Sequence, residues 1–379
     1  MRRLLLALSL VPALVIAGRA SAVVNPDISV IGQPFTTWTD DPESYSRNRF
    51  RFDAGETELF FDAALNPYAR GTVVVAFTPD EVGLEEGYFS LLRGLPGDIA
   101  LKGGRYRVGF GRLNPAHPHT YPFAQRPGVL AAYLPGEESF LETGLDLSWR
   151  VPLPGTVSLT LSADVLQGDS FRIPRVPTQS PNDPLATAPE NGDGILEPRA
   201  AWVGRLAAFL PAGDRSGVEV GVSGTEGTNN VAAGARTRVL GADARAKFWT
   251  AANAYLLVQG EFLRLERDMT DWDGPAGRYL LSTRRANGGY LFADWNWAQR
   301  YDVGASFESF ADPERANERA TAFGLFAGIA LMEETTAFRL DWRRLQPARP
   351  IGATADPEAV QQLTLRAIFS MGPHKAHQF

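Results

Sequence analysis

Polar and apolar residues alternate along most of this chain. From Val157 to Val165 the odd-numbered residues are apolar, and the residues between them are Ser, Thr, Ser and Asp. From Phe338 to Trp342, apolar residues alternate in the same way with Arg339 and Asp341. A period of two is typical of β-strands with one apolar and one polar face. A soluble β-sandwich also alternates, but it would seldom line one face with so many charges, and it stays an alternative.

Sixteen such segments follow one another along the sequence. They are 26–38, 49–63, 68–78, 83–93, 98–111, 140–151, 156–168, 199–210, 217–227, 237–250, 253–268, 284–298, 301–311, 319–332, 336–347 and 359–371. The first segment is the weakest, so fourteen or eighteen strands remain open.

The connections alternate in length. Those after even-numbered strands are short turns, such as Asn66-Pro67 and Ala251-Ala252, whereas two of the others, 112–139 and 169–198, are very long. The connection 79–82 departs from this rule by being short. Short turns on one side, long loops on the other and an even strand count are the pattern of outer-membrane β-barrels.

The sequence therefore predicts an all-β, transmembrane antiparallel β-barrel of about sixteen strands. A sheet in hydrocarbon must close, because no water is present to satisfy its edges. Each segment is long enough for one crossing, which needs roughly 9–11 residues. We expect the aromatic residues near strand ends to form interfacial girdles; these are Trp149, Trp202, Trp249, Trp295, Trp297, Tyr301 and Trp342.

The N-terminus has the pattern of a secretory signal peptide. Arg2 and Arg3 precede the apolar stretch 4–17, and Ala20-Ser21-Ala22 has the small-residue form of a cleavage site. We expect residues 1–22 to be cleaved, 23–371 to form the barrel and 372–379 to be a C-terminal tail.

Composition narrows the class of protein further. The chain has no cysteine and a formal net charge of −6, which removal of the arginine-containing residues 1–22 makes more negative. Nucleic acid is therefore not an expected partner, because binding it needs a basic face. The longest nearly apolar run after the N-terminus, Ala322 to Met332, is too short for a spanning helix, which needs roughly 20 residues.

One region resembles a known group of porins. The stretch from Gly103 to His119 reads GGRYRVGFGRLNPAHPH, and PFAQRP at 122–127 and ETGLDLSW at 142–149 follow it. Together these are similar to the phosphate-selective porin O/P-like group of Gram-negative outer-membrane porins, over about residues 25–170. The resemblance implies a sixteen-stranded, trimeric porin whose third loop, 112–139, folds into the lumen. It does not imply phosphate as the substrate, since the phosphate-selective members use several lysines and this chain has three in total.

The C-terminus departs from the porin pattern. Porins usually end on an aromatic residue that closes the last strand, and Phe379 supplies one. However, the stretch 371–378 lacks alternating apolar residues, and we interpret it as a periplasmic tail or an imperfect strand end.

Charged residues supply the candidate pore lining. The constriction candidates are Arg105 and Arg107 on the strand 98–111, and Arg112, His117, His119, Arg126, Glu137 and Glu138 in the loop 112–139. The lumen-wall candidates are Arg70, Glu142, Asp146, Arg150, Arg245, Arg339, Asp341 and Arg343. Acidic and basic residues are balanced on the polar faces, so the sequence predicts no ion preference.

Metal sites and cofactors are not expected. Zinc needs three or four ligands, and no third ligand is evident near His117 and His119, or near His374 and His377. The stretch Asn191-Gly-Asp193-Gly194 lacks the closing Glu of a calcium loop, which favours an Asx-turn.

Motifs of hydrolases are also missing. The sequence has no G-x-S-x-G, H-E-x-x-H or P-loop. A barrel phospholipase would need a histidine on a strand, and all four histidines lie in the loop or the tail.

We therefore expect no enzyme activity but a passive outer-membrane diffusion porin for small hydrophilic solutes or ions. Its expected partners are outer-membrane lipid, lipopolysaccharide, such solutes and two further copies of itself. The alternatives are a substrate-specific channel for an anion, phosphate or a small organic solute, and a barrel enzyme.

Overall fold

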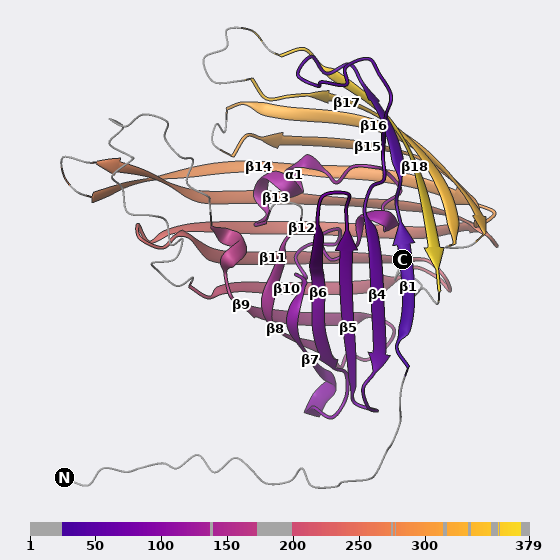
Figure 1. The fold of residues 1–379 in the computed structure, drawn as a ribbon. Coiled ribbons are helices and arrows are strands. Elements are labelled where there is room, and N and C mark those ends of the chain that lie inside the picture. The colour runs from indigo at the N-terminus through magenta and orange to yellow at the C-terminus, as the bar shows by residue number, and fades with distance from the viewer. Residues whose placement is uncertain are drawn as a thin grey trace, which may run out of the picture.

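The protein forms a closed, antiparallel β-barrel of sixteen strands (Figure 1). The computed structural model describes residues 25–136, 139–172, 199–273, 276, 278–313, 317–332, 335–349, 355 and 357–372. Each strand pairs with its neighbour along the chain, and the last strand pairs with the first, which closes the sheet.

The strand segments are β1 (Asp27–Gly32), β2 (Phe35–Thr39), β3 (Arg51–Asp53), β4 (Thr57–Ala64), β5 (Ala69–Phe77), β6 (Val82–Leu91), β7 (Ile99–Arg107), β8 (Leu141–Val151), β9 (Ser158–Leu166), β10 (Ala201–Pro211), β11 (Gly217–Asn230), β12 (Ala235–Ala251), β13 (Ala254–Asp273), β14 (Arg278–Trp297), β15 (Tyr301–Ala311), β16 (Arg319–Met332), β17 (Thr336–Gln346) and β18 (Val360–Met371). The helical turns are η1 (Pro96–Asp98), η2 (Pro118–Thr120), α1 (Gly128–Tyr133) and η3 (Asp169–Phe171). In the part of the chain that the structure describes, no helix is long and apolar enough to cross a membrane.

Two barrel strands are each interrupted once, which reconciles the eighteen segments with sixteen strands. β1 and β2 pair with β18 in one continuous register, from Gly32 opposite Phe369 to Phe35 opposite Arg366. β4 and β3 in turn pair with β1 and β2. At the second interruption Gly55 has φ +64°, and a Cβ there would clash with the carbonyl of Gln33. A glycine therefore permits the irregularity, and the predicted strands 26–38 and 49–63 are confirmed.

The barrel is apolar outside and polar inside. On β8, Glu142 is buried, whereas Leu145, Leu147 and Trp149 on the other face are 38–52% exposed. Buried carboxylates recur on β4, β9, β12, β13, β14, β15 and β17 at Glu58, Asp164, Asp243, Glu261, Asp294, Glu308 and Asp341. This inversion of the soluble pattern is what a barrel in lipid requires.

The structure corrects several predicted strand ends. β11 to β14 continue beyond the expected boundaries, and β13 and β14, of 20 residues each, project past their neighbours (Figure 1). The expected loop at 269–283 is largely a continuation of this hairpin, with Asp273 opposite Arg278. β7 instead ends early, at Arg107, since the chain leaves the sheet there and continues as the segment 108–140.

Candidate functional site

The candidate site is built on the segment between β7 and β8, residues 108–140, which contacts the barrel wall. It leaves β7 through Gly111, which has φ +65° and whose Cβ would clash with the carboxylate of Glu261 on β13. The Gly111 amide donates to Ser223 Oγ on β11 at 3.1 Å. Only a glycine permits so close an approach to the wall at this turn.

Asn114 ties the two ends of the segment together. Its Nδ2 donates to the carbonyls of Val108 (2.8 Å) and Phe140 (3.0 Å). Its Oδ1 accepts from the amide of Phe140 (2.9 Å) and from Nη2 of Arg126 (2.8 Å). Asn114 is buried, and this one side chain therefore closes the segment into a compact unit.

The apolar side of the segment packs against the wall. One buried cluster joins Phe110, Leu113, Tyr121, Phe123, Val129, Leu130 and Tyr133 of the segment to Val239, Leu257, Leu263, Tyr290, Phe292 and Phe326 of β12, β13, β14 and β16. Phe123 meets Phe292 and Phe326 edge-on, at centroid distances of 5.2 and 5.9 Å. The Tyr133 hydroxyl donates to the Ala311 carbonyl at 2.8 Å. α1 is thereby held beside β13, β14 and β15.

Polar contacts hold the segment to further strands. The amides of Arg112 and Leu113 donate to Glu261 Oε1 at 3.0 and 2.7 Å, and Arg112 Nη1 donates to Glu219 on β11 at 3.1 Å. The amides of Ala124 and Gly128 donate to Asp341 on β17 (3.4 Å) and Glu308 on β15 (2.6 Å). Glu261, Glu308 and Asp341 are buried on the polar face of the sheet, and Glu219 is half-buried.

Arg366 of β18 anchors the middle of the segment. Its guanidinium donates to the carbonyls of Pro118 (3.1 Å), Tyr121 (3.1 Å) and Phe123 (3.0 Å). Arg366 is buried, so these carbonyls replace the water that a guanidinium otherwise needs.

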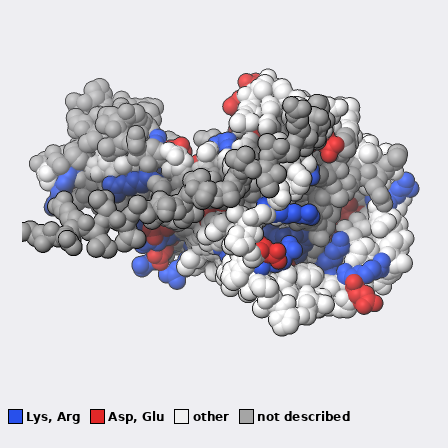
Figure 2. Space-filling model, turned by 90° about the horizontal axis from the view of Figure 1, so that it is seen from below, with Lys and Arg blue, Asp and Glu red and all other residues white. Residues whose placement is uncertain are grey.

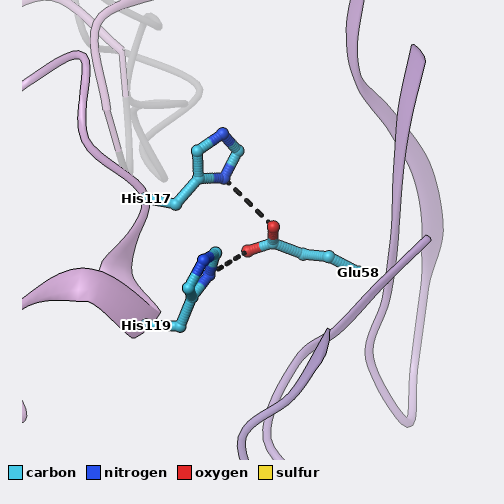
Figure 3. Close-up of side chains that lie close together, drawn as sticks. All are labelled: Glu58, His117 and His119. Carbon is cyan, nitrogen blue, oxygen red and sulfur yellow. Dashed lines mark hydrogen bonds and ion pairs between the residues drawn. The ribbon is translucent and has the colours of Figure 1, made fainter. Parts of the chain in front are cut away.

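Glu58 of β4 lies between His117 and His119 (Figure 3). His117 Nδ1 is 3.1 Å from Glu58 Oε2, and His119 Nδ1 is 3.3 Å from Glu58 Oε1. All three side chains are buried or nearly so, with Glu58 fully enclosed. Burial lowers the pKa of His117, but the charge of Glu58, the hydrogen bond to it and the charge of Glu85 together raise it by more, so the pKa lies above its usual range.

A second acidic group adjoins this cluster on β6. Glu85 Oε2 is 3.8 Å from His117 Nδ1, and Glu86 Oε2 is 3.9 Å from His117 Nε2. Arg107 forms an ion pair with Glu85, and its amide donates to Glu86 Oε1 at 2.8 Å. Arg107 is thus buried and bound to two carboxylates of β6.

Two cavities lie on either side of the segment. The first, of about 600 Å³, opens toward the short turns, where Gln299 and Arg300 line it. The second, of about 540 Å³, opens toward the long connections. In Figure 2, lysine and arginine side chains gather on the right half of the face, with fewer acidic ones among them.

The two cavities differ in charge. The first is lined by the cations Arg112, Arg245, Lys247, Arg300 and Arg339, and by Asp294 and Asp302. The second is lined by Glu56, Glu81, Glu85, Glu142 and Asp169, and by Arg105. The lining is therefore mostly basic on one side of the segment and mostly acidic on the other.

The other predicted lumen-wall residues have different partners and do not form one cluster with the histidines. Arg70 pairs with Asp62, Glu142 accepts from the Ser170 amide at 2.8 Å, and Arg343 contacts Glu308 and Gln125. Asp146 lies on the same face as Glu142, whereas Arg150 is exposed near the end of β8. Burial lowers the pKa of Arg126 in the segment.

Arg105, predicted at the pore lining, lines the second cavity and is in register with Gly87 and Thr143. Nearby on β7, Lys102 lies over the ring of Tyr106, and the Tyr106 hydroxyl donates to buried Asp164 at 2.9 Å.

The prediction that Trp249 belongs to an interfacial girdle is wrong. It lines the first cavity together with Arg245, and Lys247 Nζ lies 5.2 Å from its ring centroid. Trp249 continues the inward phase of these two residues along β12.

Some predicted residues lie outside the described part of the chain. They are Glu137, Glu138, His374, His377, Phe379, the stretch 191–194, and residues 1–22.

Sequence reasoning missed Glu85, Glu86, Glu261 and Asp302. It also saw no third candidate ligand beside His117 and His119, whereas the structure places Glu58 there. Glu85 and Glu86 follow each other at a β-bulge, where the register shifts between Val74 and Val75 and simple alternation fails. Glu261 could have been predicted on the polar face, because it lies between apolar residues of a strand.

Comparison with known sequences gives one relative. No protein-family profile matches the chain. A protein of Aquifex aeolicus, described as uncharacterized, is 30% identical over 266 residues, which are 68% of this chain and 54% of that protein. The chain thus spans about half the length of the curated relative it matches.

Solved structures share the fold. The anion-selective porin from Comamonas acidovorans has a TM-score of 0.58 at 11% identity, covering 92% of this chain and 100% of that one. The outer-membrane channel DcaP of Acinetobacter baumannii has a TM-score of 0.58 at 10% identity, covering 93% and 99%. The trimer form of OmpT from Vibrio cholerae has a TM-score of 0.52 at 10% identity, covering 92% and 100%. The fold is that of the porin barrels.

Proposed function

We propose that this protein is an outer-membrane porin, a passive diffusion channel for small hydrophilic solutes or ions. A sixteen-stranded barrel is too wide for its wall side chains to fill, so something else must define the narrowest point. We assign that role to residues 108–140, lying within the lumen as the constriction.

One observation carries this proposal: the segment contacts the buried, polar face of strands spread around the barrel. Its partners include Glu58 on β4, Glu261 on β13 and Arg366 on β18. A loop that only capped the mouth would not meet the polar faces of strands so far apart around a closed sheet.

The remaining parts of the proposal rest on the sequence and on the porin fold. Residues 1–22 would direct export and be removed, 23–371 would form the barrel and 372–379 a tail. The barrel would lie in the outer membrane, in contact with lipid and lipopolysaccharide, as a trimer. The narrower kinship with the phosphate-selective O/P-like group rests on the motifs at 103–119 and 142–149.

A second candidate, an anion-preferring channel, is favoured by the lining of the first cavity. Five cationic side chains face two carboxylates there, and rings of charge at narrow points set selectivity.

Planar-bilayer conductance of the purified, folded protein tests the proposal. Wild-type protein should give discrete ion-conducting steps, and deletion of Pro115 to Pro135 should raise the single-channel conductance because it removes the constriction. Deletion of Pro42 to Asn48, in the connection between β2 and β3, is the matched control and should leave conductance unchanged.

Folding of each variant is checked by heat-modifiable migration on a gel. Absence of steps from folded wild-type protein would refute the channel. An unchanged conductance in a folded Pro115–Pro135 deletion would place the constriction elsewhere.

A further inference from the structure

We propose that Glu58, His117 and His119 form a binding site for a divalent transition-metal ion of the Zn²⁺ type, which ties residues 108–140 to strand β4. Figure 3 shows both imidazole rings directed at the two oxygens of one carboxylate. Imidazole nitrogen and carboxylate oxygen are the donors that such ions prefer when no thiolate is present.

The spacing of the donor atoms matches a tetrahedral ion. Zn–N and Zn–O bonds of about 2.0–2.1 Å place neighbouring ligand atoms about 3.3–3.4 Å apart. The two histidine Nδ1 atoms are 3.1 and 3.3 Å from the Glu58 oxygens. All three donor atoms lie within 4.8 Å of one another. Small side-chain adjustments would therefore suffice to admit the ion.

Three donor atoms here are buried: His117 Nδ1, Glu58 Oε2 and Glu85 Oε2. His117 Nδ1 and Glu58 Oε2 face each other as an ion pair at 3.1 Å, whereas Glu85 Oε2 has no hydrogen bond. A buried carboxylate oxygen without a hydrogen bond is costly, and a coordinated cation would satisfy it together with the other two donors. Glu85 Oε2, 3.8 Å from His117 Nδ1, is placed to be the fourth ligand.

The local charge also favours a cation. Glu58, Glu85 and Glu86 surround the imidazoles, and Glu56 lies within 4.8 Å of Glu58 and Glu85. Arg107 is the cation paired with Glu85. The three carboxylates around His117, beside the one guanidinium of Arg107, leave excess negative charge in a buried place, which a divalent ion would offset.

Neighbouring groups hold the ligands in orientation. Thr120 Oγ1 donates to the His117 carbonyl at 2.7 Å, and Arg366 donates to the carbonyl of Pro118, between the two histidines. Glu86 faces Nε2 of His117, as in the carboxylate–histidine–metal arrangement that orients an imidazole ligand. Glu58 itself stands on a paired strand.

Residues of the site line both cavities. Glu56 and Glu85 line the cavity that opens toward the long connections. His117 and His119 line the cavity that opens toward the short turns. The donor atoms themselves are buried, so an ion reaching either cavity would need small side-chain movements to enter the site.

The test uses full-length, folded, chelator-treated protein in detergent and follows Zn²⁺ binding by equilibrium dialysis and calorimetry. We expect one tight Zn²⁺ per chain. His119→Gln and Glu58→Gln should each weaken binding by at least about 10–100-fold, since loss of an outer-shell partner alone costs that much. The double variant His374→Gln/His377→Gln removes the other two histidines and should leave the tight site intact.

A measurement on the unmodified protein guards against misfolded variants. Diethylpyrocarbonate modifies accessible imidazoles, and mass spectrometry locates the labelled histidines. Zn²⁺ should protect His117 and His119 and leave labelling of His374 and His377 unchanged. The proposal is overturned if tight binding is absent, if the tail variant abolishes it, or if Zn²⁺ gives His117 and His119 no protection. None of these readouts depends on channel activity.

Discussion

Asn114 uses all of its hydrogen-bonding capacity inside the protein. Its amide group joins Val108, at the start of the 108–140 segment, to Phe140 at the end, and also holds Arg126. Because water cannot reach these groups, each depends on the others for its partner. A single buried side chain thus fixes where a long segment begins and ends.

Asn114→Ala should loosen the segment without unfolding the barrel. The substitution leaves the Phe140 amide without its partner, and such a loss costs about 1–3 kcal/mol. Amide hydrogen exchange over residues 108–140 should therefore accelerate, by about tenfold for each 1.4 kcal/mol lost. Asn66→Ala, in the short turn between β4 and β5, is the control. Equal exchange in the two variants would show that Asn114 does not hold the segment.

At the scale of the strand, side chains of β8 point alternately to the apolar outer face and to the polar inner face of the barrel. Leu147 and Trp149 are exposed on the outer face, whereas Asp146 lies on the inner face with Glu142. A one-residue shift of register would exchange these faces. The cysteine-free chain makes the separation easy to measure.

Single cysteines at 146 and 147 should react differently with a charged, membrane-impermeant thiol reagent. Asp146→Cys should react because its face meets water, and Leu147→Cys should be protected when the protein is in a bilayer. Trp149→Cys and Arg150→Cys repeat the comparison nearer the strand end. Faster labelling at 147 than at 146 would mean that the assigned faces are reversed.

Elements of this fold were predictable where alternation was continuous. The segments 140–151 and 301–311 agree with β8 and β15 almost to the residue, because each residue there contributes to one face or the other. Alternation failed as a guide where a bulge interrupts β6 at Glu85 and Glu86.

The histidine cluster shows a different limit of sequence reasoning. His117 and Glu58 lie far apart in the chain, and no periodicity relates a loop residue to a strand residue. They meet because Arg366 and the apolar cluster set the path of the segment across the barrel. Such contacts depend on tertiary packing, which a local pattern does not encode.

At the scale of the whole molecule, charge is unevenly distributed along the barrel. The cavity on the side of the short turns is mostly basic, and the one on the side of the long connections is mostly acidic. Equal numbers of acidic and basic residues on the predicted polar faces indicated no ion preference. Selectivity depends on the charges at the narrow part of the path, so their arrangement matters more than their sum.

Reversing charge in the basic cavity should shift the channel toward cations. Arg245 and Lys247 lie close together on the inner face of β12, and both line this cavity. The double variant Arg245→Glu/Lys247→Glu replaces two cations by two anions there, and the reversal potential in a KCl gradient should move toward the cation-selective sign. The control, Arg284→Glu/Arg285→Glu, makes the same change in net charge at exposed positions of β14. Salt screens charges beyond about 8–10 Å, so the control should have little effect. Equal shifts in both variants would mean that net charge, and not the lining of this cavity, determines selectivity.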